Sequence, residues 1–545
     1  MSWHMADIWE NIAQAIPDKP ALVCGDRRYS WAEYEERAAR LATVLVKHGL
    51  KSGAKLSIYS HNSAEYMETQ FAAFKARITS VNINYRYLEA ELTHVITNSD
   101  SEAVVYQAQF APRLAAIRDQ LPNVKLFLEI DDGSGEHLDG SVSYETAMLA
   151  AAPMKPIPRS DDDLYMLYTG GTTGMPKGVM YYHKSFASAL FSKGFEMREM
   201  AAPDSAAEFG AKVRSLHDAG AVSRVIPACP LMHGTGMWVG AMIGHSLGGC
   251  VILFDNSHFN PQAVWQLAQD ERATDITIVG DVFARPMLAA LNEAKNAGTP
   301  YDLSSLQMMG SSGVMWSSEV KKGLLEHLDI VIIDSMGASE GSMGSAVTTR
   351  ATTATDKTAS FQMAETTKIL SETGEIIQPG SGDIGLICNG GMVPLGYYKD
   401  PVKSAETFRT FNGVRYSIPG DFATVEADGS VTLLGRGSMS INSGGEKVFP
   451  EEVEETLKKH DSIYDCLVVG VPDDRFGEKV CAVISVTPGA AFDEEALNEH
   501  IRGKLADYKS PRCYVVVENV PRAANGKAGY KDAKNIALER FAIAN

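Results

Sequence analysis

One glycine- and threonine-rich stretch with a single lysine decides how this chain is interpreted: Tyr168-Thr169-Gly170-Gly171-Thr172-Thr173-Gly174-Met175-Pro176-Lys177-Gly178. A short apolar run, Leu164 to Leu167, precedes it. Glycine has no Cβ, so backbone N–H groups can approach an anion closely. Threonine hydroxyls add donors, and lysine adds a mobile positive charge. The stretch therefore predicts a polyphosphate-binding loop that follows a strand, rather than a plain surface turn.

The order of residues in this loop disfavours the commonest phosphate-binding motif. A Walker loop requires the pattern G-x-x-x-x-G-K-[ST]. Here Pro176 precedes Lys177 and Gly178 follows it. A P-loop nucleoside triphosphatase is therefore not expected.

The bulk composition indicates a globular protein that can bury a large core. The chain has 545 residues, of which 45% are hydrophobic and 22% are charged. This length suggests roughly three to four domain-sized units. The formal net charge of −18 argues against general nucleic-acid binding, where basic surfaces dominate.

The cysteine pattern indicates a reducing compartment. Seven cysteines are scattered without a C-x-x-C pair, which is typical of free thiols rather than of a zinc site or a disulfide framework. Met1 to Lys19 carries acidic residues and no long apolar core, so a secretory signal is not expected. The sequence has no run of 18 apolar residues that would predict a membrane span. We therefore expect a cytoplasmic protein.

Predicted strands alternate with predicted helices over the N-terminal part. Ser30-Trp31-Ala32-Glu33 is a capping box that opens a helix. Strands near 55–59, 81–84 and 103–106 alternate with helices near 64–75 and 88–97. This pattern predicts a doubly wound, parallel sheet with ligands at the carboxyl ends of its strands. Residues 192–224 lack a clear period and are expected to form a surface excursion.

Two segments fit a hydrolase motif by letter alone. Gly244 to Gly248, with Ser246, and Gly337 to Gly341, with Ser339, both match G-x-S-x-G. A nucleophile elbow needs a strand, a sharp turn and then a helix. The predicted order is reversed at Ser246, and the residues after Ser339 are poor helix formers. A serine hydrolase therefore stays only a remote alternative.

The loop at 168–178 resembles the phosphate loop of the adenylate-forming superfamily, which includes acyl-CoA synthetases, amino-acid adenylation domains and luciferases. That loop reads roughly Tyr-Thr-Ser-Gly-Thr-Thr-Gly-x-Pro-Lys-Gly, and Gly170 stands where serine is usual. Further segments resemble family motifs and occur in family order: Cys229 to Gly236, Gly310 to Gly313, Asp334 to Glu340, Gly385 to Tyr398, Tyr416 to Asp421, Gly435 to Glu454 and Pro521 to Lys527.

The resemblance implies an ATP site. Asp334 would face the adenine amino group, and Met336 stands where an aromatic ring usually stacks on adenine. Asp421 would clamp the ribose hydroxyls, and its spacing of 15 from Arg436 supports this role. The predicted ATP-binding residues are Thr169, Gly170, Gly171, Thr172, Thr173, Gly174, Lys177, Asp334, Met336, Asp421 and Arg436.

The resemblance also implies catalytic and acyl-binding residues. Ser339 would bond the α-phosphate, Glu340 would hold Mg²⁺, and Lys527 would insert into the active site from a C-terminal loop. The wall of the acyl pocket would comprise His233, Trp238, Phe283, Ser312 and Gly313.

A two-domain architecture follows from the same resemblance. We expect an α/β fold with a large N-terminal domain, residues 1–435, built from doubly wound, mostly parallel sheets plus a small β-barrel-like part. A hinge at 436–440 contains Ser438, where Asp or Lys is usual, and leads to a small α+β domain, residues 441–545. Gly444, Gly445 and Lys447 would line the path of coenzyme A.

The function implied is an ATP-dependent, AMP-forming acyl-CoA synthetase that uses ATP, Mg²⁺ and coenzyme A. The wording of the phosphate loop and of Ser440 to Lys447 is similar to that of bacterial enzymes that activate steroid side chains and other hydrophobic acids. An adenylating enzyme that loads a carrier-protein thiol is the alternative. The expected partners are a carboxylic acid, ATP and coenzyme A, without nucleic acid, and the sequence leaves a homo-oligomer open.

Overall fold

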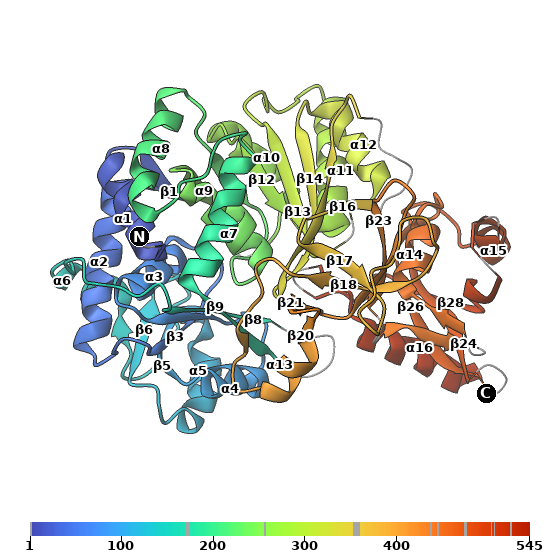
Figure 1. Cartoon of the computed structure of the whole chain (residues 1–545), viewed down its shortest axis with the longest axis horizontal. Helices are drawn as coiled ribbons and strands as arrows, with labels where there is room; N and C mark the ends of the chain where they lie inside the picture. Colours follow the sequence, from blue (N-terminus) through green and yellow to red (C-terminus); the bar gives the residue numbers. More distant parts are fainter. Residues whose placement is uncertain are drawn as a thin grey trace.

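A computed structural model of the protein describes residues 3–169, 175–254, 258–314, 316–352, 360–436, 439–443, 446–473, 477–502, 504–505, 507–523 and 526–544. A large N-terminal body and a smaller C-terminal part lie beside each other (Figure 1). Within the described ranges, each helix is too short or too polar to cross a lipid bilayer.

The first parallel sheet confirms the predicted alternation of strands and helices. Its strands run in the order β4-β3-β5-β6-β7, and every neighbouring pair is parallel. Helix α2 (Trp31–Lys47) begins with the expected capping box, in which Ser30 and Glu33 bond each other's backbone. The elements are β3 (Lys55–Tyr59), α3 (Ala64–Lys75), β4 (Thr79–Asn82), α4 (Glu89–Asn98), β5 (Ser101–Gln107), β6 (Leu126–Ile130) and β7 (Val142–Ser143).

The largest sheet has a parallel half from β1 to β14, with β2 antiparallel at its edge, and an antiparallel half beyond β14. Its order is β2-β1-β11-β10-β12-β13-β14-β15-β16-β23-β22-β18-β21-β20. Helices α10, α11 and α12 pack on the parallel half through one apolar cluster. The bounds are β1 (Pro20–Cys24), β2 (Arg27–Ser30), β10 (Arg224–Pro227), β11 (Cys250–Leu253), α10 (Pro261–Asp270), β12 (Asp275–Ile278), α11 (Gly280–Asn296), β13 (Met308–Ser312), α12 (Ser318–His327) and β14 (Val331–Ala338).

The small barrel-like part that the sequence suggested does not close among the described residues. Its strands instead extend the antiparallel half of the largest sheet, and β17 branches from β18. The strands are β15 (Gly341–Thr348), β16 (Ser360–Met363), β17 (Thr367–Leu370), β18 (Gly385–Asn389), β20 (Phe408–Phe411), β21 (Val414–Ser417), β22 (Asp421–Val425) and β23 (Val431–Arg436).

A third, small sheet carries the glycine-rich stretch. Strands β8 (Leu164–Thr169) and β9 (Lys177–Tyr182) form an antiparallel hairpin, and β19 (Gly396–Tyr397) pairs with β9. Helix α7 (His183–Glu196) follows β9, so a strand separates the glycine-rich stretch from the helix.

The segment expected to be a surface excursion is in part a packed helix. Helix α7 continues to Glu196, and α8 (Ala206–Asp218) lies against α1 (Met5–Ala15) (Figure 1). Phe209 and Val213 of α8 are buried, and the Phe209 ring packs against Phe191 and Phe195 of α7. A Cβ added at Gly210 would lie 3.1 Å from the backbone oxygen of Asn11, so glycine permits the close approach. The few apolar residues of α8 lie among polar ones, so their packing role was recognised only once the structure showed the neighbouring helix.

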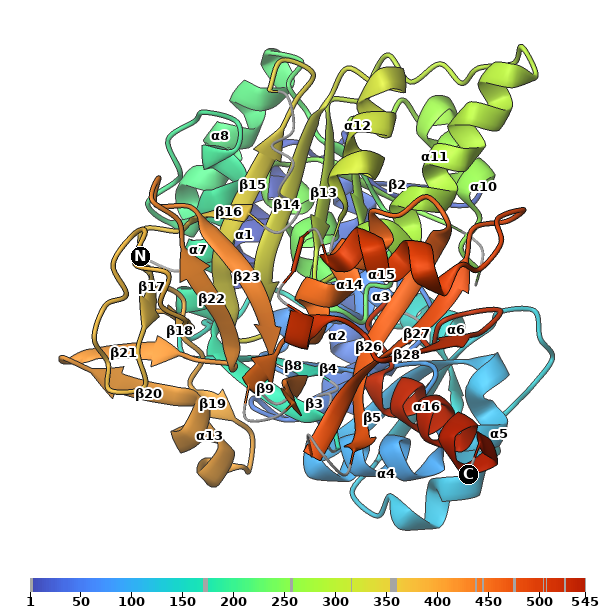
Figure 2. The same ribbon diagram turned by 90° about the vertical axis from the view of Figure 1, so that its right-hand side faces the viewer.

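The C-terminal part confirms the predicted small α+β domain. Its sheet has the order β25-β24-β27-β26, and β28 pairs with β27 in parallel (Figure 2). The elements are β24 (Ile441–Ser443), β25 (Glu446–Val448), α14 (Pro450–Lys458), β26 (Ile463–Asp473), β27 (Gly477–Val486), α15 (Glu494–Arg502), β28 (Cys513–Val516) and α16 (Tyr530–Ala544).

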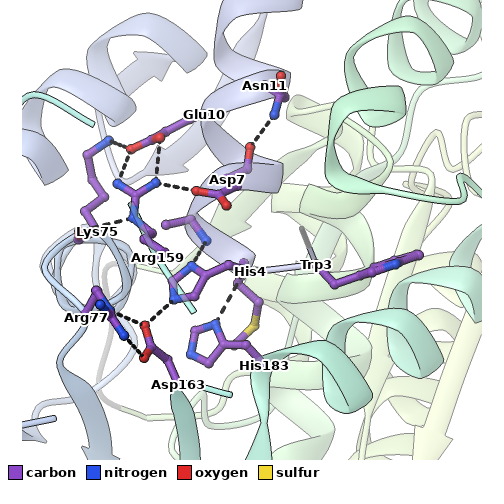
Figure 3. Close-up of polar contacts among 12 residues, drawn as sticks. Trp3, His4, Asp7, Glu10, Asn11, Lys75, Arg77, Arg159, Asp163 and His183 are labelled. Atoms are coloured by element: carbon purple, nitrogen blue, oxygen red, sulfur yellow. Dashed lines mark hydrogen bonds and ion pairs between the residues drawn. The ribbon is translucent and has the colours of Figure 1, made fainter. Parts of the chain in front are cut away.

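A buried polar cluster fixes the open end of the β8–β9 hairpin (Figure 3). Asp163 directly precedes β8, and His183 directly follows β9. The imidazoles of His4 and His183 stack at 4.0 Å, and His4 Nε2 lies 3.3 Å from Asp163 Oδ2. Arg77 donates two hydrogen bonds to Asp163, at 2.8 and 2.7 Å, and Met5 N–H donates to His183 Nδ1. The N-terminus of α1 is thereby tied to the base of the hairpin.

We predict that this cluster makes the protein sensitive to acid. Burial lowers the pKa of His183 well below its ordinary value, and the electrostatic interaction with His4 adds to that shift. The unfolded chain then takes up a proton that the folded protein refuses, so the free energy of unfolding falls as the pH drops below about 6.5. Asp163 is different, because its lowered pKa gives stability that is lost only below about pH 4.

The substitution His183→Gln should therefore flatten the loss of unfolding free energy between about pH 7 and 5, by up to about 1.4 kcal/mol per pH unit. Urea unfolding at several pH values measures this slope. His137→Gln is the matched control, since His137 is solvent-exposed and Glu129 raises its pKa. A His183→Gln slope equal to that of the unaltered protein would contradict the prediction.

Candidate functional site

The hairpin ladder fixes both ends of the predicted phosphate loop. Thr169 and Lys177 lie directly opposite each other as the last pair of the β8–β9 ladder. Lys177 Nζ lies 3.0 Å from Asp400 Oδ2 and 5.5 Å from the ring centroid of Tyr397. The other predicted loop residues lie outside the described residues: Gly170, Gly171, Thr172, Thr173 and Gly174.

Glu340, the predicted metal ligand, is held by a tyrosine from the small sheet. Ser339 and Glu340 form the turn between β14 and β15, and Glu340 is only 8% exposed. The Tyr397 phenol donates a hydrogen bond to Glu340 Oε1 at 2.7 Å, and Tyr181 O–H donates to Ser339 O at 2.8 Å. Sequence reasoning missed Tyr397, because its phenol reaches Glu340 only when β19 pairs with β9. Glu340 and Lys177 therefore both contact one tyrosine, Glu340 at its hydroxyl and Lys177 at its ring.

Asp334 lies on β14 with a partner that the sequence did not reveal. Its Oδ2 is 2.7 Å from Lys321 Nζ on α12, and both side chains are buried. Burial raises the pKa of Asp334, and the Lys321 charge opposes that shift. Met336 follows on the same strand and is buried against Phe361. The carboxylate that is expected to face adenine therefore also forms a buried ion pair with Lys321.

The predicted ribose and hinge residues are adjacent in the antiparallel half of the large sheet. Asp421 and Arg436 are directly opposed in the β22–β23 ladder, so their spacing in sequence becomes proximity in space. Lys447 lies on β25, which pairs with β24. Ser438, Gly444 and Gly445 lie outside the described residues.

Part of the predicted acyl pocket is brought together at the ends of β10 and β13. Thr235 Oγ1 donates to Ser312 O at 3.3 Å, and Gly313 follows with a φ of +92°. Thr235 opens η3 (Thr235–Met242), a π-helix, and such helices often mark functional sites. His233 lies just before it, and its Nε2 atom is buried without a hydrogen-bond partner among the described residues. An unmatched buried nitrogen of this kind can accept a bond from a ligand.

Two other predicted pocket residues lie apart from each other. Trp238 Nε1 donates to the Tyr165 hydroxyl at 2.7 Å, and its ring packs against Phe186. Phe283 lies on α11 and makes an edge contact with Phe259, with ring centroids 4.6 Å apart. The two residues belong to different hydrophobic clusters, so they do not form one wall.

The C-terminal loop reaches the N-terminal domain near His233. A Cβ added at Gly526 would lie 3.2 Å from the Val282 side chain, so this loop lies against the first turn of α11. The charge of Lys527 contributes to the low pKa of His233, about 3, although burial is the larger cause. Lys527 and His233 lie far apart in the sequence, yet they interact electrostatically in the folded protein.

Neither serine of the hydrolase motifs lies in a nucleophile elbow. Ser246 ends α9 (Ile243–Ser246), is fully buried, and donates its hydroxyl to Ile243 O at 2.8 Å. A strand follows it rather than precedes it. Ser339 lies between two antiparallel strands, with no helix after it. Both sites lack the strand–turn–helix order that an elbow requires.

Comparison with known protein families agrees with this geometry. The family of AMP-binding enzymes matches residues 9–398, and the C-terminal domain of AMP-binding enzymes matches residues 452–527. The chain therefore belongs to the AMP-binding enzyme family, as the resemblance to adenylate-forming enzymes predicted.

Individual similar proteins indicate which members of this family the chain resembles. The chain is 40% identical to a medium/long-chain-fatty-acid–CoA/3-oxocholest-4-en-26-oate–CoA ligase of Mycolicibacterium smegmatis, over 99% of this chain and 97% of the relative. It is also 40% identical to a 3-oxocholest-4-en-26-oate–CoA ligase of Rhodococcus rhodochrous, over 98% and 96%. The crystal structure of an anthranilate CoA ligase in complex with anthranoyl-AMP matches with a TM-score of 0.84, covering 99% of this chain and 98% of that one. At 22% identity, that match shows the fold alone.

We predict that a fluorophosphonate probe labels neither Ser246 nor Ser339 in the native protein. The reason is that Ser246 is buried and bonded to a backbone carbonyl, and Ser339 lies in a strand–strand turn. Mass spectrometry of the labelled protein is the measurement, with a serine hydrolase as the positive control. Stoichiometric modification of either serine would restore the hydrolase hypothesis.

Proposed function

We propose that this protein is an ATP-dependent, AMP-forming acyl-CoA synthetase that converts a hydrophobic carboxylic acid, a fatty acid or a steroid side chain, into its CoA thioester. The observation that carries the proposal is that Lys177 and Glu340 both contact Tyr397, while Lys527 approaches His233 from the C-terminal domain. Identity of 40% over nearly the whole length to ligases of such acids supports the choice of substrate.

The first half-reaction is a nucleophilic substitution at the α-phosphorus of ATP. One oxygen of the acid's carboxylate attacks the α-phosphorus of ATP, an acyl-adenylate forms, and the bond to pyrophosphate breaks. Negative charge must be neutralised at the α-phosphate and on the departing pyrophosphate. Lys177, Lys527 and the loop donors Thr169, Thr172 and Thr173 would supply that stabilisation. A general base is unnecessary, because a carboxylic acid is already ionised at pH 7.

Glu340 fits the role of a Mg²⁺ ligand. Mg²⁺ prefers oxygen ligands and is usually held by one or two carboxylates together with substrate phosphates. The bond from Tyr397 orients the Glu340 carboxylate before any ligand arrives. The ion would supply positive charge to the phosphates, while Ser339 would donate a hydrogen bond to the α-phosphate.

The second half-reaction requires the small domain to move. In this proposal, residues 441–545 rotate against residues 1–435 about the hinge at 436–440, with Ser438 as the pivot. Lys527 would leave, and Gly444, Gly445 and Lys447 would line the path of the CoA thiol. The thiol sulfur then attacks the acyl carbon, AMP leaves, and the thiol proton is released to solvent.

The expected reducing cytoplasm fits the seven free cysteines.

We predict that Lys527→Ala lowers acid-dependent pyrophosphate release by about 100- to 1,000-fold, because a charge aimed at the transition state is lost. The same variant should convert a supplied acyl-adenylate to the thioester within about threefold of the normal rate, since Lys527 is then displaced. Lys531→Ala, at an exposed position on α16, is the matched control. Unchanged pyrophosphate release in Lys527→Ala would refute this role.

A panel of acids tests both the substrate class and the acyl acceptor. Long-chain fatty acids and a steroid acid with a carboxylated side chain should exceed anthranilate by at least about 10-fold in kcat/KM, because each buried CH₂ adds apolar transfer energy. AMP release should require coenzyme A, and the thioester should be detected by mass spectrometry. Acid-dependent pyrophosphate release without CoA-dependent AMP release would favour delivery to a carrier-protein thiol instead.

A further inference from the structure

Three sheets of the N-terminal domain meet at one asparagine. Strand β4 is an edge strand of the first parallel sheet, and β8 is an edge strand of the small sheet. The two strands lie side by side but belong to different sheets (Figure 2). The segment after β10 of the largest sheet passes the same point. Asn82, the last residue of β4, is 8% exposed and lies where these three parts converge.

Strands β4 and β8 are not joined by a backbone ladder, and the Asn82 carboxamide supplies hydrogen bonds between them. Its Nδ2 donates to Tyr168 O at 2.8 Å and to Met232 O at 2.6 Å. Its Oδ1 accepts from Tyr168 N–H at 2.6 Å. Both amide hydrogens and the oxygen are therefore used, which only a primary carboxamide of this length can do here.

A second asparagine holds the next part of the same segment. Asn62 Nδ2 donates to Cys229 O at 3.0 Å, and Asn62 Oδ1 accepts from Leu231 N–H at 2.7 Å. Residues 229–232 are thus fixed by the side chains of Asn62, between β3 and α3, and of Asn82, at the end of β4.

The positions that Asn82 joins are next to the predicted reacting groups. Tyr168 directly precedes Thr169, where the phosphate loop begins, and Met232 directly precedes His233 in the acyl site. We propose that Asn82 is a positioning residue for adenylation: it sets the distance between the backbone that holds the nucleotide and the backbone that holds the acid. This inference rests on the proposed acyl-CoA synthetase function.

The physical reason is that adenylation joins two separate molecules. Their reacting atoms must meet within a narrow range of distance and angle, and a misplacement of about 1 Å can lower the rate about 100-fold. A supplied acyl-adenylate is already one covalent molecule, so its thioesterification does not depend on that distance. The two half-reactions should therefore respond differently to a change at Asn82.

The experiment compares the half-reactions in Asn82→Ala and in a matched control. Asn98→Ala also removes one hydrogen bond to Tyr168, but to its phenol rather than its backbone, because Asn98 Oδ1 accepts from the Tyr168 hydroxyl at 2.6 Å. Adenylation is measured as pyrophosphate release, thioesterification from a supplied acyl-adenylate, and the folded fraction from thermal unfolding.

We expect Asn82→Ala to lower kcat of adenylation about 30- to 100-fold and thioesterification less than about threefold. Asn98→Ala should change both by less than about threefold. Equal losses in both half-reactions, or losses that follow the folded fraction, would show a merely structural role and overturn the proposal. If the unaltered protein releases no pyrophosphate with any acid, the proposed function fails instead.

A second variant gives a pH signature. In Asn82→Asp, an ionised carboxylate would face the two carbonyl oxygens that Nδ2 now serves, whereas a protonated carboxyl could donate to one of them. Adenylation by this variant, relative to the unaltered protein, should rise at least about threefold from about pH 8 to 6. Asn82→Ala should show no such rise. A flat relative profile in Asn82→Asp would also overturn the proposal.

Discussion

The proposed active site of this enzyme depends on the position of one antiparallel hairpin. Strands β8 and β9 flank the glycine-rich stretch, and glycine permits close approach of the backbone to a ligand. The ladder fixes Thr169 and Lys177, the described residues at either end of that stretch. The stacked histidines and Asp163 hold the hairpin at its base, and Asn82 holds β8 beside the site. Supporting residues of this kind are what keep a binding loop in its productive geometry.

In the proposed mechanism, positive charge comes from both domains. Lys177 lies in the small sheet beside Tyr397 and Glu340, whereas Lys527 arrives from the C-terminal domain against α11. The low pKa of His233 reflects both its burial and the approach of that lysine. A charge on a separate domain can be present for one step and absent from the next. This arrangement suits a reaction in two halves that place opposite demands on one site.

The sequence predicted those parts of the fold that local residue patterns specify. The alternating strands and helices over residues 55–107, the capping box at Ser30 and the small C-terminal domain all appeared as expected. Helix α8 was missed, because its apolar residues are few and their partner, α1, lies almost two hundred positions earlier. The expected barrel-like part became an extension of the main sheet, since strand length and period do not encode which edge a strand joins.

The sequence by itself determined the family, the phosphate loop and the order of the motifs, because those features are runs of neighbouring residues whose chemistry is legible without a fold. The spacing of Asp421 and Arg436 singled out both residues, but their direct opposition in the β22–β23 ladder came from the structure. Only the tertiary structure decided the partners that cross between elements. It placed Lys321 on Asp334, Tyr397 on Glu340, and Asn82 between Tyr168 and Met232, and it separated Trp238 from Phe283. Hydrogen bonds and buried ion pairs are short-range, so they exist only once packing brings distant segments within about 3 Å of each other.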